Sequence, residues 1–430
     1  MTCPDCARLL QENQTLRAEV EELRRRLAAY ENPHTPPSRR PYPTRPKRPS
    51  STRYPGRPRG HRGVTRIRRR PDEVVPPPRI SRCRSCGSEL GEPRYVGHRV
   101  VEEVSSPHPR RVIDYLTYTY ECPGCGEHAE SRHHDCPPSG RFGRNALVQA
   151  TLMRYAERLP FRKVSEALGR TYGLDVAPAT VLSVTDRVAT WLRPGYEEIR
   201  ARVMASPVVY VDETGLHLDG AKGWVWAFTC PSGTVYAIRR SRGAKVLREV
   251  LGPGYGGVLV CDGWKSYPKF TDRIQRCWSH LLREASYLAE HVEEAGAMNE
   301  GLHALYRRLV SCSDRPPPAG FVEAARAEMV RLVEGPWASE ECGRFAYKVL
   351  GGLDHWFTFL GEPGVEATNN RAERALRELV VQRKVWGCLR NERGSTACET
   401  VMSLLYTWRG EGRDPVTALG EALTREWSKS

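Results

Sequence analysis

VVYVD at residues 208–212 and GVLVCD at residues 257–262 decide the fold that this sequence predicts. Each is a short apolar run rich in valine that ends in an aspartate, and such runs are typical of strands buried on both faces of a sheet. Two more strands are expected at 224–230 and 234–240, joined by a hairpin at Pro231-Ser-Gly, and a helix at 244–251 leads into the last strand. The pattern indicates an α/β fold.

The two aspartates are candidate metal ligands. Three strands, a helix and a fourth strand that carries the second acid is the order expected of a ribonuclease H-like sheet, and Asp212 and Asp262 stand 50 positions apart. Two-metal phosphodiester transfer needs hard oxygen ligands that hold two Mg²⁺ or Mn²⁺ ions about 3.5–4 Å apart. A lone aspartate at a strand end is more often a turn or cap residue. A third acid is needed, and periodicity leaves several acids open.

Residues 80–136 carry two C-x-x-C pairs, each followed by glycine, as in the two knuckles of a zinc ribbon. Four thiolates around one Zn²⁺ leave no open position, so this metal is expected to be structural. Alternating residues between the pairs predict strands. His133, His134 and Cys136 are interpreted as surface residues because they form a poor ligand set. The four predicted zinc ligands are Cys83, Cys86, Cys122 and Cys125.

Residues 140–195 predict a helical region of helix-turn-helix type. A helix at 145–157 is closed by Pro160, and two more follow, separated by a glycine turn, with Pro178 at a first helical position. Helix-turn-helix spacing also arises by chance in helical domains, so a helix that reads a DNA groove and an ordinary helical bundle both stay open.

The N-terminal segment 1–31 shows heptad spacing, which predicts a short coiled coil. We expect a homo-oligomer through residues 6–30; the alternative is one helix that packs on its own domain. Cys3 and Cys6 are interpreted as incidental, since two thiolates cannot complete a zinc site. Residues 32–79 are rich in proline and arginine, and they predict a linker that contacts DNA phosphates or only aids solubility.

The whole chain of 430 residues has a formal net charge of +15 and a pI near 9.3, which favours a polyanionic partner. The sequence contains no apolar run of 18 residues, so no membrane-spanning helix is expected. Charged residues follow the N-terminus where a secretory signal would have its apolar region. A cytoplasmic location is therefore expected, in which paired cysteines bind metal before they form disulfides.

Four segments resemble the transposases of the insertion-sequence-66 family, and the similarity spans almost the whole chain. They are VDET at 211–214, CDGWKSY at 261–267, CWSH at 277–280 and NNRAERALRELVVQRK at 369–384, the most distinctive. The resemblance implies an Asp-Asp-Glu triad of Asp212, Asp262 and Glu373, in a catalytic domain at 205–400 with a helical insertion at about 285–365. It also implies a C-terminal helical region at 401–430, accessory proteins of the same element and a prokaryotic, nucleoid-associated setting.

Around Glu373 the sequence is strongly basic. Glu373 could instead form a surface ion pair with Arg377 one turn later. The arginines and the lysine are interpreted as phosphate contacts that bring double-stranded DNA to the metals. His280 of the CWSH segment is a weaker candidate for contact with the scissile strand or with a carboxylate. The predicted DNA-binding residues are Arg371, Arg374, Arg377, Arg383 and Lys384.

The leading hypothesis is a metal-dependent DNA transposase. Water would cleave the element ends, and the freed 3′-hydroxyls would attack target DNA at the same three acids. One alternative is a nuclease or resolvase of the same fold that hydrolyses without joining. The other is a non-enzymatic zinc-ribbon regulator derived from a transposase.

Overall fold

The computed structural model describes residues 11–23, 69–103, 110–312 and 317–429. Its centre is a mixed five-stranded sheet in the order β7-β6-β5-β8-β9. Neighbours β7, β6 and β5 are antiparallel, whereas β5, β8 and β9 run parallel. The elements are β5 (Val208–Leu218), β6 (Ala221–Cys230), β7 (Gly233–Arg239), α6 (Ala244–Leu251), β8 (Val258–Cys261) and β9 (Ile274–Arg276). The expected hairpin and helix are confirmed, and β9, with only three residues, is an addition.

One expectation about Asp212 is wrong. The sequence predicts that Asp212 ends its strand, but β5 continues for six more residues to Leu218. The extension is stabilised by the antiparallel partner β6, which pairs with β5 from Tyr210 to Leu218. The parallel partner β8 pairs only with Val208–Tyr210. Asp212 therefore lies on β5 just beyond the last residue that pairs with β8.

Alternate residues of β5 and β8 enter two different cores, as the two-residue period of a strand requires. Val209, Val211 and Leu259 pack in the first core with helices of the N- and C-terminal regions. Val208, Tyr210, Val258 and Val260 pack in the second core with helices of the region after β9. Both faces of these strands are covered, which explains their continuous apolar sequence.

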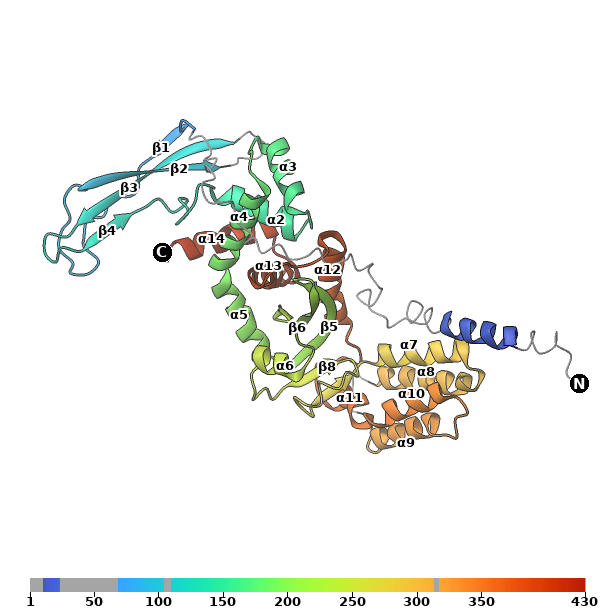
Figure 1. Cartoon of the computed structure of the whole chain (residues 1–430). Coiled ribbons are helices and arrows are strands. Elements are labelled where there is room, and N and C mark those ends of the chain that lie inside the picture. The colour runs from blue at the N-terminus through green and yellow to red at the C-terminus, as the bar shows by residue number, and fades with distance from the viewer. Residues whose placement is uncertain (1–10, 24–68, 104–109, 313–316, 430) are drawn as a thin grey trace, which may run out of the picture.

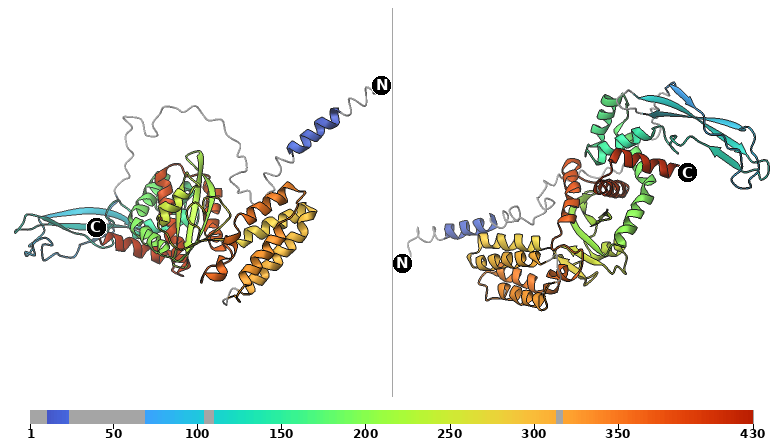
Figure 2. Two further views of the ribbon diagram at one scale, coloured as in Figure 1. Left: turned by 90° about the horizontal axis from the view of Figure 1, so that it is seen from below. Right: turned by 180° about the vertical axis from the view of Figure 1, so that it is seen from behind.

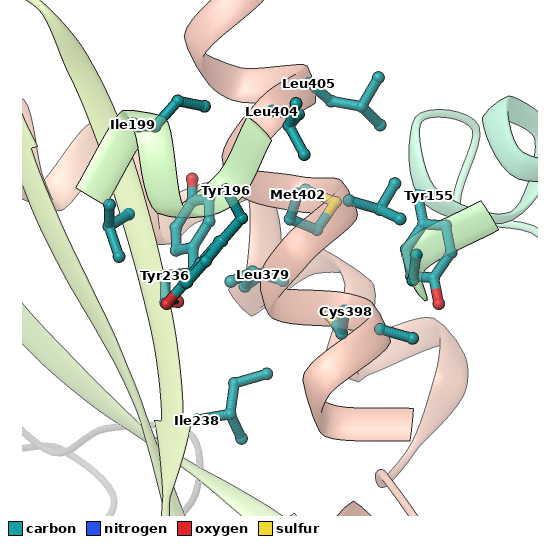
Figure 3. Packing of buried hydrophobic residues seen from close by; sticks show 14 of the residues in the cluster. Tyr155, Tyr196, Ile199, Tyr236, Ile238, Leu379, Cys398, Met402, Leu404 and Leu405 are labelled. Atoms are coloured by element: carbon teal, nitrogen blue, oxygen red, sulfur yellow. Dashed lines mark hydrogen bonds between the residues drawn. The ribbon is translucent and has the colours of Figure 1, made fainter. Parts of the chain in front are cut away.

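The first core joins helices that precede the five-stranded sheet in the chain with helices that follow it. Its helices are α2 (Arg144–Tyr155), α3 (Phe161–Tyr172), α4 (Pro178–Trp191), α5 (Arg193–Met204), α12 (Asn370–Trp386), α13 (Glu392–Gly410) and α14 (Pro415–Trp427). Figure 3 shows Tyr196 of α5 and Tyr236 of β7 beside Met402 of α13, and the Tyr196 hydroxyl donates to the Tyr236 carbonyl at 3.2 Å. Between α3 and α4, Gly173 adopts a left-handed conformation that ends α3, and Pro178 begins α4.

Helix α13 covers the outer edge of strand β7. Three β7 amide groups donate to side chains spaced one helical turn apart: Thr234 to Thr407, Tyr236 to Ser403, and Ile238 to Glu399, at 2.9–3.1 Å. The β7 residues alternate, so these are the amides that point away from β6. The polar positions of α13 thereby replace the strand that an open sheet edge would otherwise accept.

The second core is helical. Its helices are α7 (Trp278–His291), α8 (Gly296–Ser311), α9 (Phe321–Val333), α10 (Glu340–Leu350) and α11 (Thr358–Gly361), with short 3₁₀ turns at Glu293–Ala295 and Leu353–Trp356. The α7–α10 helices lie on the opposite side of the sheet from a separate β arm (Figures 1 and 2). The chain returns from them through α12 to the sheet.

The β arm is a four-stranded sheet in which β3 pairs with β1, β2 and β4. Its strands are β1 (Glu73–Val75), β2 (Tyr95–Glu103), β3 (Arg111–Glu121) and β4 (His128–Ser131). The arm extends away from the helices of the first core (Figure 1).

The segment 11–23 is a helix with every residue exposed. The rest of the predicted coiled coil, the Cys3/Cys6 pair and the linker as far as residue 68 lie outside the described residues. In the part of the chain that the structure describes, no helix has the length and apolar character needed to cross a membrane.

Candidate active site and cysteine cluster

The register of β5 and β8 brings the two aspartates level. Every paired residue in these parallel strands differs by 50 positions, from Val208 with Val258 to Tyr210 with Val260. Two residues further along both segments stand Asp212 and Asp262. Because alternate residues share a face, both aspartates follow the residues that enter the second core. The spacing of 50 seen in the sequence is thus the register of the sheet.

Glu373 reaches the same place from the first turn of α12. Buried Asn369, directly before this helix, donates from Nδ2 to the Val211 carbonyl at 2.8 Å. Residues four apart lie on one face of a helix, so fixing Asn369 beside Val211 points Glu373 toward Asp212. The sequence predicts no role for Asn369, although its position one helical turn before the predicted acid is a signal for one.

Cys277 completes this connection. Its amide donates to the Cys261 carbonyl at 2.8 Å, and its sulfur accepts from the Asn369 amide at 3.1 Å. A continuous hydrogen-bonded chain therefore runs from Cys261, next to Asp262, through Cys277 and Asn369 to Val211, next to Asp212. These contacts give the CWSH and NN segments a structural purpose.

The other two acids act electrostatically on Asp212. Burial, followed by the charges of Glu213, Asp262 and Glu373, raises the pKa of Asp212 well above its ordinary value. A cluster of carboxylates in a half-buried position is costly unless a proton or a cation neutralises it.

His280 of α7 lies against the third acid, with 3.4 Å between His280 Nδ1 and Glu373 Oε1. Burial lowers the pKa of His280, although the Glu373 charge opposes that shift, so the imidazole is neutral near pH 7. Within the described residues, buried Glu373 Oε1 accepts no hydrogen bond. Cys277, His280 and Glu373 each offer an atom within 4.8 Å of the others. A buried carboxylate oxygen that accepts no hydrogen bond, such as Glu373 Oε1, is suited to bind a cation.

The predicted DNA-binding residues of α12 divide into two groups. Arg371 pairs with Glu366 at 2.6 Å, and Arg383 donates to Thr214 Oγ1 at 3.1 Å. These two side chains bind the protein itself. The remaining three are exposed and fall within roughly 80° of one another around the helix. They are Arg374, Arg377 and Lys384.

At the tip of the arm the four cysteine sulfurs lie within 4.8 Å of one another. The two turns that carry them have the same hydrogen bonds. Cys83 N donates to Ser88 O at 2.9 Å and Gly87 N to Cys83 O at 2.9 Å, while Cys122 and Gly126 repeat both bonds at 2.8 Å. Gly87 and Gly126 have φ of 75° and 70°, which a residue with a Cβ adopts only with strain. This arrangement can hold a tetrahedral metal ion.

The model of the transposase IS66 family matches residues 139–397, more than half of the chain. The chain belongs to the IS66 transposase family. The matched segment of this IS66-family chain contains Asp212, Asp262 and Glu373 and excludes the cysteine cluster.

Relatives of this IS66-family chain occur in Sinorhizobium fredii (strain NBRC 101917 / NGR234). Uncharacterized protein y4hP is 23% identical over 82% of the chain and 71% of its own length. Uncharacterized protein y4jD is 24% identical over 82% of the chain and 76% of its own length. Uncharacterized protein y4qI is 24% identical over 67% of the chain and 60% of its own length.

Proposed function

We propose that this IS66-family chain is a DDE transposase that cleaves the ends of an insertion sequence and joins the 3′-hydroxyls to target DNA. The observation that carries the proposal is the placement of the acids: Asp212 and Asp262 level on β5 and after β8, with Glu373 directed at them by Asn369. The five strands and the α6 crossover are, in this proposal, a ribonuclease H-like core.

In the proposed site the three carboxylates supply the oxygen ligands. Two Mg²⁺ or Mn²⁺ ions bound there would activate the attacking oxygen and stabilise the leaving oxygen. The charges of Asp262 and Glu373 both act on Asp212, so Asp212 would help to hold both ions, and Asp262 and Glu373 would each help to hold one. His280 is assigned to supporting Glu373.

DNA would reach the acids along α12. The exposed cationic stripe of Arg374, Arg377 and Lys384 follows the face next to Glu373 and is assigned to phosphate contacts. Arg371 and Arg383 are assigned to positioning α12, through Glu366 and Thr214, before any contact with DNA.

The remaining regions have supporting roles in this proposal. Residues 80–136 form a zinc ribbon with one structural Zn²⁺, because its two matching turns give four thiolates and no open position. Residues 140–195 form a DNA-binding helical region, and 205–400 the catalytic domain with its insertion at about 285–365. The coiled coil at 1–31, the C-terminal region at 401–430, self-association through 6–30 and accessory proteins stay predictions. The linker at 32–79 also stays a prediction, although its residues Glu73–Val75 form strand β1 of the arm.

A joining assay tests the proposed reaction. Purified protein is incubated with Mg²⁺, plasmid target and a DNA duplex that carries an element end already cut to a 3′-hydroxyl. Joined product is expected from the unaltered protein and none from Asp212→Asn, while both bind the end duplex equally. Cleavage of uncut ends without joining would instead support a nuclease or resolvase. Binding without either reaction would support a DNA-binding regulator.

A further inference from the structure

Glu213 is a buried carboxylate that the proposed reaction does not use. It follows Asp212 on β5, and successive strand residues point to opposite faces, so it lies on the side of the first core. Its side chain is fully enclosed. Oε1 accepts from Arg242 Nε at 2.6 Å, and Oε2 accepts from the Tyr267 hydroxyl. Both oxygens are therefore held by hydrogen bonds.

Arg242 connects Glu213 to the segment after β8. Its guanidinium carbon lies 3.8 Å from the centre of the Trp264 ring and 4.6 Å from that of Trp224. Its carbonyl accepts from Trp264 Nε1 at 3.2 Å and from Ser266 Oγ at 2.9 Å. Side chain and backbone of one residue thus hold the same segment.

That segment, residues 262–267, begins with Asp262. The Asp262 Oδ1 atom accepts from the Trp264 amide at 2.8 Å, so the orientation of the carboxylate depends on where Trp264 stands. Tyr267, at the other end, is fully buried and donates directly to Glu213. We call residues 262–267 the Asp262 loop. Both of its halves are tied to Glu213, one directly and one through Arg242.

A buried ion pair is weak evidence for stability, because apolar residues of similar volume often stabilise a core at least as well. Its recognised use is to impose one geometry. Groups that orient metal ligands without touching the metal commonly change metal affinity when they are altered. The Glu213 network has the required form, since it starts beside one acid and ends at another.

We propose that Glu213 is a positioning residue that holds the Asp262 loop, through Arg242 and Tyr267, so that Asp262 and Asp212 bind the same divalent cations. This inference rests on the proposed function. It assigns Glu213, the second acid of the VDET segment, a role in the site from the opposite face of the sheet.

Glu213→Gln tests the inference, with Glu399→Gln as the matched control. Glu399 is also buried, pairs with Arg239 at 2.6 Å and accepts from the Ile238 amide, but its partners lie on β7 and not in the Asp262 loop. Two quantities are measured: the Mg²⁺ concentration for half-maximal end cleavage and amide hydrogen exchange of residues 262–267 in metal-free protein.

Glu213→Gln is expected to raise the half-saturating Mg²⁺ concentration about 10-fold or more, with DNA affinity unchanged. Exchange in the Asp262 loop is expected to quicken. Tyr267→Phe, which removes one of the two direct bonds, gives the same changes in smaller measure and serves if Glu213→Gln fails to fold. Glu399→Gln is expected to lower thermal stability without either change.

Unchanged loop exchange, or an unchanged Mg²⁺ requirement, in Glu213→Gln and Tyr267→Phe would overturn the inference. Equal changes in Glu399→Gln would overturn it as well, because they would show a general loss of structure. If the unaltered protein cleaves no DNA with any divalent metal, the proposed function fails, and the exchange comparison still decides whether Glu213 holds the loop.

Discussion

The cysteine cluster of the arm and the acid cluster of the sheet gather their side chains over different distances. In the arm, the turns at 83–88 and 122–127 each form their own hydrogen bonds and need only one strand pairing to meet. On the sheet, Asp212, Asp262 and Glu373 depend on strand register, on the Asn369 contact and on two cores. The cysteine site can therefore be lost or restored while the rest of the chain stays folded. The acid site, in contrast, is lost whenever the fold is lost.

The largest effect is expected when a predicted metal ligand of the acid site is changed, compared with a change elsewhere on the same helix. Glu373→Gln should reduce end cleavage on the order of a thousandfold or more, because the amide is a poor ligand for a hard cation. Glu378→Gln is the control on the same helix; it loses ion pairs with Arg158 and Arg409 and should leave cleavage within about threefold. A comparable loss in both variants would show that α12 acts only as scaffold.

A second prediction isolates the arm. Cys86→Ser should reduce bound zinc from one ion per chain to none and make residues 80–136 sensitive to protease, because zinc binding and folding are coupled. The melting temperature of the five-stranded core should not change. Zinc content, proteolysis and calorimetry are the measurements. Cys388→Ser, outside the cluster and half-buried, should keep the zinc; retention of zinc by Cys86→Ser would exclude the four-cysteine site.

The smallest effect concerns stability and pH. Because the pKa of Asp212 is raised in the folded chain, its contribution to stability is present below the unfolded pKa of about 3.9 and is lost as pH rises through the folded pKa. Without metal, Asp212→Asn should therefore raise Tm by about 2–4 °C near pH 8 and by less near pH 5.

Thermal melts in chelator at both pH values check this. Mg²⁺ should raise the Tm of the unaltered protein more than that of Asp212→Asn. Asp219 is exposed in the turn after the same strand and serves as the control. Asp219→Asn should change neither the Tm in chelator nor the rise in Tm that Mg²⁺ causes. If Asp212→Asn is less stable than the unaltered protein at both pH values, the prediction that clustered negative charge destabilises the metal-free protein is wrong.

The sequence predicted what depends on neighbours in the chain. The alternation and apolar character of 208–212 and 257–262 predicted two buried strands, and glycine after each C-x-x-C pair predicted two turns. It misplaced the end of β5, because the pairing that extends this strand comes from β6. Glu373 came only from the family resemblance, since its position depends on Asn369 meeting Val211 across 158 residues. The sequence predicted no role for Glu213, because the apolar periodicity of a strand does not indicate a buried acid beside a predicted ligand.

The edge of β7 has a consequence for the newly made chain. Its amides are satisfied by α13, and about 150 residues lie between the end of β7 at Arg239 and the start of α13 at Glu392. At synthesis rates of about 5–20 residues per second, that edge stays open on the ribosome for on the order of ten seconds or more. An open edge is a template for pairing with another chain. Translation that stops before residue 392 should therefore yield aggregates, and the carboxylates become competent only when the C-terminal helices have emerged.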